Sequence, residues 1–408
     1  MASLAPRDLA DACRLAARVP AGATAVEYRM DLATEPIPPG PLVALDARPA
    51  IVTHRTLREG GRFTGSLEEY RRLLVDAYDA GATVDVEHAF GLLDDRAFLP
   101  DRRRVLVSLH APFGLPDDWK GSVAAMTATG ARAVKLVAST HDLPAALRVA
   151  ALQRDAGSGP LAIFPMGPAS APARVLSAFF GSALVFGSVD GDTAPGQLTL
   201  EELLDTYGVG SPRPIDALYG IAGTNPSGSL SPRLHNALFR SRGLASLYLP
   251  LPVADFEREL PFLLENDPPF RGFSVTRPWK LAAARAGSPS DDVRATGAAN
   301  TLVRARGGWR AENTDVDGVF DPLADHDTGE GRAAVILGAG GAGRAAVVAA
   351  RRLGYEVALS ARRDEEADRI AADLGIDSLA WEDVAASEAD LYVNATPAGW
   401  KDGDEPAV

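Results

Sequence analysis

Short apolar runs alternate with amphipathic stretches along the first 210 residues. Seven runs have the length and composition of buried strands, at 25–32, 50–56, 83–88, 104–110, 133–139, 161–167 and 183–189. Between most of them the apolar positions recur every three or four residues, as in 66–82 and 142–157, which is typical of amphipathic helices. Strand and helix in alternation predict a parallel sheet covered by helices. Seven strands in this length predict an α/β fold of the (β/α)₈ barrel type, although an eighth strand is not evident.

The sequence also predicts a helix at the start of the chain and two further units after residue 210. Residues 1–20 form an amphipathic pattern that predicts a helix. Glycine and proline without periodicity at 208–214 indicate a linker. A second α/β pattern follows, and after a polar stretch comes a strand, a glycine turn, a helix and a strand. We expect three domains: a barrel at 1–210, a substrate-binding domain at 215–325 and a Rossmann domain at 332–408.

Composition and charge limit the classes of protein that fit this pattern. With 46% apolar and 23% charged residues the chain has an ordinary globular composition. Its net charge of −13 weighs against nonspecific nucleic-acid binding. The single cysteine, Cys13, cannot form an internal disulfide, and no apolar run approaches the length of a membrane span. We therefore expect a cytoplasmic protein without a membrane or nucleic-acid partner, and we predict no metal site.

In a (β/α)₈ barrel the chemistry lies at the carboxyl ends of the strands, and the polar residues there suggest a site. Glu27, Arg29 and Asp31 alternate, which places them on one face of a strand. Lys135 lies among apolar residues, and such burial lowers the pKa of a lysine; a neutral amine can attack a carbonyl to form a Schiff base. His110, at the end of the preceding strand, is the natural base.

Each of these residues also has a structural interpretation. A lysine in a strand commonly extends its amine to water at an edge, and a histidine near a strand end is commonly a satisfied structural residue. The arginines favour a site for an anionic substrate, and a carboxylate is the expected anion. The polar residues at the strand and loop ends are Glu27, Arg29, Arg55, Glu59, Glu87, His110, Lys135, Met166, Arg174 and Gln197.

Several of these segments together resemble type I 3-dehydroquinate dehydratase. They are EYRMD at 27–31, VTHRTLREGG at 52–61, VDVE at 84–87, VSLHAP at 107–112, AVKLVA at 133–138 and TAPGQ at 193–197. The resemblance implies that Lys135 forms an imine with the ring ketone, that His110 abstracts the C2 proton and that Glu59 supports the histidine. It also implies substrate-binding roles for Glu27, Arg29, Arg55, Met166, Arg174, Thr193 and Gln197. The family has a strand before its first helix, and here we expect that strand to be missing.

A second group of polar residues follows the linker. Ser231 precedes Pro232 at a predicted helix start, where a serine commonly acts as the N-cap. Lys280 is expected to open a helix, where a cation opposes the helix dipole, and this mildly unfavourable placement suggests a use. Asp315 follows Asn313 and is by itself typical of a turn. If Lys280 and Asp315 converge, the pair can share a proton with a substrate hydroxyl.

The glycines of the third unit predict a dinucleotide site. Gly338, Gly340 and Gly343 have the GxGxxG spacing, directly after an apolar strand and at the start of a helix. Amide groups at such a helix start can hold a pyrophosphate. The next strand ends in Arg362 and Arg363 without an acid at its tip, which favours the 2′-phosphate of NADP over the free ribose of NAD.

From residue 218 onward the chain resembles shikimate dehydrogenase, through the blocks SLSP, VTRPWK, ANT, NTD, GAGGAGRA and VNATPAG. The resemblance implies that Lys280 and Asp315 are the catalytic pair. It implies substrate contacts for Ser229, Ser231, Thr276 and Asn300, and cofactor contacts for Gly338, Gly340, Gly341, Gly343, Arg362, Arg363, Asn394 and Thr396. The family has further Rossmann strands, so we expect an incomplete cofactor domain and an impaired second activity.

The order of the two halves resembles the bifunctional 3-dehydroquinate dehydratase/shikimate dehydrogenases. Such an enzyme would dehydrate 3-dehydroquinate and reduce the product with NADPH to shikimate, with these small molecules as partners. A class I aldolase would share the barrel lysine but not TAPGQ. A quinate dehydrogenase and a non-enzymatic regulator remain as alternatives. The presence of Lys135, His110, Lys280 and Asp315 favours an enzyme.

Overall fold

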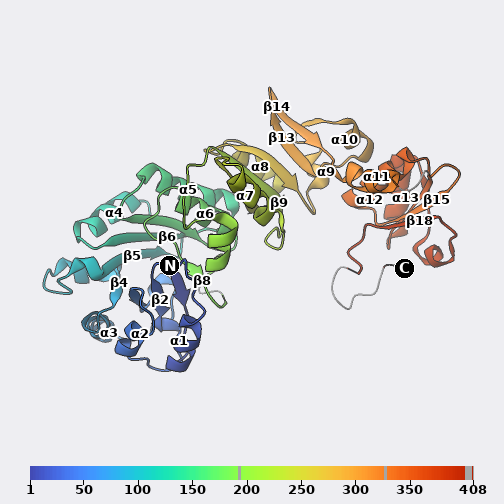
Figure 1. Cartoon of the computed structure of the whole chain (residues 1–408). Helices are drawn as coiled ribbons and strands as arrows, with labels where there is room; N and C mark the ends of the chain where they lie inside the picture. Colours follow the sequence, from blue (N-terminus) through green and yellow to red (C-terminus); the bar gives the residue numbers. More distant parts are fainter. Residues whose placement is uncertain (192–193, 326–328, 400–406, 408) are drawn as a thin grey trace. The chain divides into compact units, whose positions relative to one another are not determined.

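The computed structural model describes residues 1–191, 194–325, 329–399 and 407. Two compact units are present (Figure 1). The first comprises Met1–Leu218, Ser227–Ala254 and Pro261–Pro269. The second comprises Tyr219–Pro226, Asp255–Leu260 and Phe270–Val408. Each unit is described by itself, and the expected division into three domains stays a prediction.

The first unit contains an eight-stranded sheet whose recorded strand pairs are all parallel, in the order β7-β6-β5-β4-β3-β2-β1-β8. This sheet confirms the barrel class predicted from the alternating pattern. The strands are β1 (Ala2–Leu4), β2 (Val26–Arg29), β3 (Ala50–Thr53), β4 (Thr83–Glu87), β5 (Val105–Ala111), β6 (Ala133–Ser139), β7 (Leu161–Met166) and β8 (Gly187–Ser188).

The edge between β7 and β1 is bridged by the segment before β8. Ala183 N donates to Leu161 O at 3.0 Å, and Gly187 N donates to Met1 O at 3.0 Å. The run at 183–189 was expected to be a full strand, but only its two residues in β8 have strand geometry.

The prediction that the chain opens directly with a helix, without the first barrel strand, is wrong. Residues Ala2–Leu4 form β1, which is buried and pairs with both β2 and β8. The helix α1 begins only at Leu9, after the N-cap Asp8, whose carboxylate accepts from Asp11 N. A strand of three residues is too short for an alternating pattern to be seen, and its apolar side chains merge with those of the following helix.

Helices cover the sheet and are fixed by local capping. Ser66 accepts from Glu69 N at the start of α3, and Asp142 accepts from Ala145 N at the start of α5. Tyr70 and Leu74 of α3 are buried in one core cluster with Val84 of β4. The helices are α1 (Leu9–Ala16), α2 (Pro39–Ala44), α3 (Leu67–Asp79), α4 (Trp119–Ala128), α5 (Leu143–Ala156) and α6 (Ala171–Phe179), with a π-helical turn at Glu202–Tyr207.

The first unit also contains α7 (Ser231–Ser241) and β10 (Ser246–Pro252). The Asn236 side chain joins them, since it donates to Tyr248 O and accepts from Tyr248 N. The expectation that Ser231 caps α7 is wrong. The N-cap is Leu230, Ser231 is the first helical residue, and Ser231 N donates to the hydroxyl of Ser229 at 3.2 Å.

The second unit begins with strands in the order β9-β11-β13-β14-β12, in which β13 and β14 form an antiparallel hairpin. The short helix α9 starts at Lys280, and α11 starts at Asp315, as the chain turns out of these strands. The elements are β9 (Ala217–Gly223), α8 (Phe256–Leu264), β11 (Phe270–Val275), α9 (Lys280–Ala283), β12 (Ser288–Pro289), α10 (Asp291–Thr296), β13 (Thr301–Ala305), β14 (Gly308–Glu312) and α11 (Asp315–Ala324). Residues 217–218 of β9 and 261–264 of α8 are counted in the first unit.

A parallel four-stranded sheet of Rossmann type, in the order β17-β16-β15-β18, completes the second unit. Ile336 of β15 and Leu359 of β16 are buried against Val347 and Ile370 of the two helices. The elements are β15 (Ala333–Leu337), α12 (Gly341–Arg352), β16 (Glu356–Ser360), α13 (Asp364–Leu374), β17 (Asp377–Ser378) and β18 (Leu391–Asn394). Among the helices that the structure describes, none is both long enough and apolar enough to cross a bilayer.

Candidate active sites

The side chain of Lys135 lies inside the barrel, on β6. Its Nζ is 2.5 Å from a carboxylate oxygen of Asp85 on β4 and 4.0 Å from one of Glu27 on β2. The same nitrogen lies 4.8 Å from the ring centroid of Phe186. Only 4% of the lysine side chain is exposed. Lys135 therefore does not extend to water at a sheet edge, and its amine faces an enclosed polar site.

His110 and Glu59 form a pair beside the lysine. A Glu59 carboxylate oxygen accepts from His110 N at 3.0 Å and lies 3.1 Å from the Nδ1 of the ring. Burial, together with the positive charges of Arg55 and Lys135, holds the pKa of His110 well below its usual range. Burial also raises the pKa of Glu59 to about 7, against the opposing effect of Arg55. The imidazole is therefore neutral at neutral pH, which is the state a proton acceptor needs.

Arg55 lies at the centre of a buried charge cluster. Its guanidinium is 2.9 Å from Glu59, 3.0 Å from Asp85 and 3.2 Å from Glu87, and it donates to Ser108 Oγ at 2.9 Å. Only 4% of its side chain is exposed. Arg55 thus lies among three carboxylates of the protein, so this arginine orders the site as well as facing the cavity.

Glu27 and Arg29 lie at the end of β2. Ser3 Oγ and Thr53 Oγ1 donate to the two oxygens of Glu27 at 2.7 and 2.9 Å, which fixes its carboxylate. Asp31 does not continue the strand face as the alternation predicted. The strand ends at Arg29, and Asp31 lies in a 3-10 turn from which it bonds the Arg29 guanidinium at 2.8 Å. The strand pattern failed here because β2 has only four residues.

A cavity of about 90 Å³ joins these side chains. Thr193 lies outside the described residues, and the other predicted substrate-binding residues of the barrel all line this cavity. Its lining includes Glu27, Arg29, Arg55, Glu59, His110, Lys135, Met166, Arg174 and Gln197. The tertiary structure thus brings together residues that are up to 170 positions apart in sequence.

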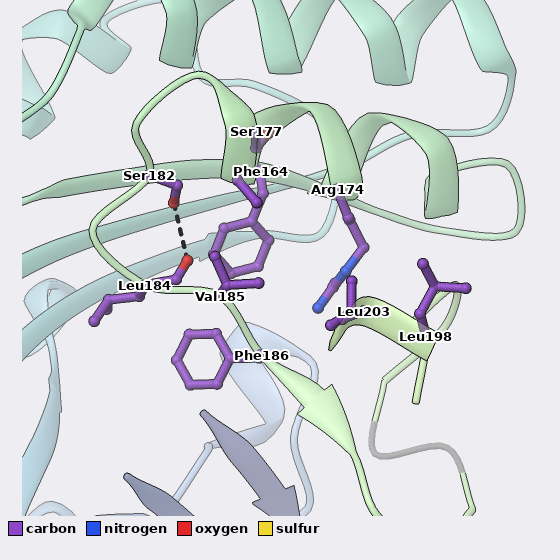
Figure 2. Close-up of a pocket in the computed structure, with 10 residues that line it drawn as sticks. Phe164, Arg174, Ser177, Ser182, Leu184, Val185, Phe186, Leu198 and Leu203 are labelled. Atoms are coloured by element: carbon purple, nitrogen blue, oxygen red, sulfur yellow. Dashed lines mark hydrogen bonds between the residues drawn. The ribbon is translucent and has the colours of Figure 1, made fainter. Parts of the chain in front are cut away.

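A smaller cavity of about 10 Å³ adjoins this one. Arg174, Phe164 and Phe186 line both cavities. Figure 2 shows Arg174 extending from its helix into the space beside Phe164. Its guanidinium carbon lies 4.9 Å from the Phe164 ring centroid, and one nitrogen donates a long bond of 3.5 Å to Pro165 O. Burial lowers the pKa of Arg174 to about 10, so the group stays charged at neutral pH and can bind an anion.

Lys280 and Asp315 converge in the second unit, as the resemblance implied. Nζ of Lys280 lies 2.5 Å from one oxygen of Asp315, and Asn300 Nδ2 donates to the other oxygen at 2.8 Å. The exposed fractions of the two charged side chains are 18% and 30%. Thr276 follows β11 and packs against Gly223. Ser229 and Ser231, which were also predicted to bind the substrate, belong to the first unit, whereas Lys280 and Asp315 belong to the second.

The glycine turn after β15 has the close packing that its sequence predicted. A Cβ on Gly343 would lie 1.7 Å from Gly338 O, so only glycine fits there. A Cβ on Gly340 would meet nothing within 4 Å, and Gly340 lines a cavity. A Cβ on Gly341 would lie 2.8 Å from the Lys280 side chain, so the catalytic candidate and the start of α12 are neighbours.

A cavity of about 270 Å³ extends from the glycine turn to the tip of β16. Arg363 is engaged by Glu366 at 2.5 Å, whereas Arg362 has no recorded partner among the described residues. Asn394 shapes the following loop, since it accepts from Thr396 N and donates to Ala398 O. The lining comprises Arg277, Gly338, Ala339, Gly340, Ala361, Arg362, Arg363, Glu366, Ala395, Thr396 and Pro397.

Sequence reasoning missed several residues of these sites. Asp85 alternates with Glu87 in TVDVE, the signal that had identified Glu27 and Arg29, so it could have been found. Ser3 could not have been found, because the strand that contains it was not predicted. Other missed residues are Thr53, Ser108, Phe186 and Arg277. Within the described residues, no group of three or more His, Cys, Asp or Glu side chains is arranged to hold a metal ion.

Comparison with known proteins identifies both halves. The family model described as Type I 3-dehydroquinase matches residues 1–211, and that described as Shikimate dehydrogenase substrate binding domain matches residues 221–302. The Arabidopsis thaliana protein named bifunctional 3-dehydroquinate dehydratase/shikimate dehydrogenase, chloroplastic, is 30% identical over 393 residues, which cover 89% of this chain and 64% of that protein.

Two further relatives cover one or both halves. A protein of Anaeromyxobacter sp. (strain K) named shikimate dehydrogenase (NADP(+)) is 39% identical over 194 residues, 45% of this chain and 69% of that protein. The solved structure of dehydroquinate dehydratase and shikimate dehydrogenase from S. pombe AroM is 26% identical with a TM-score of 0.43, and the match covers 97% of this chain and 82% of that one. The chain spans less than two thirds of the Arabidopsis relative's length.

Proposed function

The chain belongs to the type I 3-dehydroquinase family, whose model matches residues 1–211, and from this premise we propose that its first unit dehydrates 3-dehydroquinate through an imine on Lys135. The observation that carries the proposal is the shared cavity. One enclosed space of about 90 Å³ is lined by a buried lysine, a neutral histidine held by a glutamate, and a charged arginine. An amine, a base and an anion site are the groups that this reaction requires.

The geometry assigns a role to each group in the proposed reaction. The Lys135 nitrogen attacks the ring ketone, and two protons from that nitrogen leave with the ketone oxygen as water, which gives a protonated imine. Because Nδ1 of His110 faces Glu59, its Nε2 is left to accept the C2 proton of the substrate. His110 then returns that proton to the departing hydroxyl, and hydrolysis of the imine frees the product. Arg174 supplies the charge for the substrate carboxylate.

An assay of the product and a covalent trap test this function. We expect 3-dehydroquinate to be converted to a conjugated enone that absorbs in the ultraviolet. Borohydride added during turnover should attach substrate mass to Lys135, and peptide mass spectrometry locates it. Equal labelling of a Lys135→Ala variant would show that the nucleophile is another residue.

For the second unit we propose reduction of 3-dehydroshikimate to shikimate with NADPH. The Lys280–Asp315 pair supports this, because a lysine that is hydrogen-bonded to an aspartate can pass a proton to or from a substrate hydroxyl. Asn300 orients Asp315 from the other side. The substrate would lie against this pair, with Thr276 as a hydroxyl donor on the adjacent loop.

The residues around the glycine turn fit NADP. Gly340 and the start of α12 would hold its pyrophosphate and Arg362 its 2′-phosphate, and Thr396 also lines the cavity. When bound, NADPH supplies the hydride. The proposal is tested by following NADP-dependent oxidation of shikimate, with quinate in parallel. Oxidation of quinate alone would identify a quinate dehydrogenase instead.

A cytoplasmic location also remains a proposal. It rests on the single, exposed Cys13, which suits a reducing compartment. The name of the Arabidopsis relative places that protein in the chloroplast. Fractionation of the source cells with an antibody to this chain would test the location.

A further inference from the structure

Asp85 is the carboxylate in closest contact with the Lys135 amine, and nothing above gives it a function. Its side chain is fully buried on β4. One oxygen lies 2.5 Å from Nζ of Lys135 and 3.0 Å from Arg55, and the other accepts from Ser108 Oγ at 2.5 Å. Burial by itself would raise the pKa of Asp85, but Arg55 and Lys135 hold that pKa well below its usual range. Asp85 is therefore a fixed negative charge beside the reacting nitrogen.

We propose that Asp85 is the counter-ion of the Lys135 nitrogen throughout the dehydration, first of the ammonium and then of the protonated imine. The inference rests on the proposed imine chemistry. The ammonium and the ketone give a protonated imine and water. The Nζ–carbon bond forms, the carbon–oxygen bond breaks, and the oxygen leaves with two protons from the nitrogen. The positive charge thus stays on Nζ, and one carboxylate can neutralise it before and after the bond forms.

The neighbouring carboxylates are less suited to this role. Glu27 lies 4.0 Å from Nζ, and both its oxygens accept from Ser3 and Thr53. Both oxygens of Glu87 are held by Thr56, through its amide and its hydroxyl. Glu59 is directed to His110. A buried cation that lacks a close partner is strongly disfavoured, so the contact with Asp85 stabilises a positive charge on Nζ.

The charge on Nζ changes at one later step. When His110 takes the C2 proton, the C–H electron pair forms a carbon–carbon double bond to the imine carbon, and the π pair of the carbon–nitrogen bond moves onto nitrogen, which becomes neutral. Asp85 therefore stabilises the imine that precedes this step. The other charged or titratable groups that face Asp85 and Lys135 are Glu27, Arg55, Glu59, Glu87, His110 and Arg174.

Borohydride trapping as a function of pH tests the inference. The full chain is mixed with 3-dehydroquinate between about pH 5 and pH 9, and the adduct on Lys135 is quantified by mass spectrometry. In Asp85→Asn the charged nitrogen has lost its counter-ion, so it requires a higher proton concentration. We expect roughly tenfold less adduct than in the unmodified chain near pH 8, with recovery toward pH 5. A purely structural role for Asp85 would lower the adduct equally at every pH, and that result would overturn the inference.

Three variants control the experiment. Glu87→Gln removes a carboxylate from the same cluster that does not contact Lys135. The pH profile of trapping in this variant should match that of the unmodified chain. A shift as large as that of Asp85→Asn would overturn the inference. Asp85→Glu retains the charge and should keep the unmodified profile with a lower yield. If Asp85→Asn does not fold, Asp85→Ser, which removes the same charge with a smaller side chain, gives the same test.

The two levels of the proposal fail in different ways. No adduct with the unmodified chain at any pH would overturn both the proposed dehydration and the role of Asp85. Normal trapping in the unmodified chain, with an unshifted profile in Asp85→Asn, would overturn the role of Asp85 alone.

Discussion

Both halves of the chain place a lysine against an aspartate, with 2.5 Å between Nζ and a carboxylate oxygen. The surroundings of the two pairs differ. In the barrel, Lys135 and Asp85 are 4% and 0% exposed, and Arg55 and Ser108 bind the same aspartate. In the second unit, the exposed fractions are 18% and 30%. Water screens the second pair, so its interaction is weaker at the same distance.

The comparison shows that a short contact does not by itself define a chemical role. A buried pair sets the charge state of an amine that must form a covalent bond. A pair near water is suited to exchanging a proton, because either partner can be charged or neutral at modest cost.

The largest effect is expected from removing each lysine. Lys135→Ala should lower dehydration by about 10⁴-fold or more, because it deletes the nucleophile. Lys280→Ala should lower shikimate oxidation by about 10²–10⁴-fold, since water can replace a proton-transfer group in part. Steady-state assays of each reaction measure both. Lys120→Ala, at an exposed lysine of α4, is the matched control and should change neither. Equal losses of activity in Lys135→Ala and Lys280→Ala would contradict the proposed difference between the two lysine–aspartate pairs.

The next effect concerns pH. The pKa of Glu59 is raised to about 7, so the carboxylate that holds His110 becomes protonated as the pH falls through 7. We expect kcat/KM for dehydration to decline below about pH 7, and Glu59→Gln to flatten this limb and lower the plateau about tenfold. A pH–rate profile of both proteins is the measurement. If kcat/KM of Glu59→Gln declines below about pH 7 as in the unmodified chain, another group causes that decline.

A smaller effect distinguishes the two arginines at the tip of β16. Arg362→Gln should weaken NADP binding about tenfold, because a charge-assisted contact to the 2′-phosphate is lost. Arg363→Gln should weaken it less, since Arg363 is already engaged by Glu366. Fluorescence titration with NADP and NAD gives the dissociation constants. A matching loss for NAD would mean that Arg362 does not contact the 2′-phosphate.

The smallest effect is expected at the first strand. Ser3→Ala removes one hydrogen bond to Glu27, worth about 1 kcal/mol, so kcat/KM for dehydration should fall about fivefold. Thermal unfolding provides the control, because the midpoint should move by only a few degrees. A variant as active as the unmodified chain would show that Thr53 orients Glu27 without help from β1.

Much of the fold and of both sites could be read from local patterns. Alternating apolar runs predicted β2 to β7, since strands of four to seven residues leave a visible signal. Lys135, His110 and the glycine turn were found because strand ends and helix starts are marked by local sequence. The pairing of Lys280 with Asp315 was also predicted correctly. The roles of these residues in catalysis stay predictions.

By itself, the sequence determined which residues stand at the ends of its strands and where its glycine turn lies, because both depend on neighbours along the chain. Only the tertiary structure decided that Ala2–Leu4 completes the sheet and that Asp85, fifty positions earlier, faces Lys135. It also decided that Lys135 is buried, whereas Lys280 is partly exposed. These outcomes depend on strand order and register, which bring distant residues together, and no periodicity along the chain encodes such pairings.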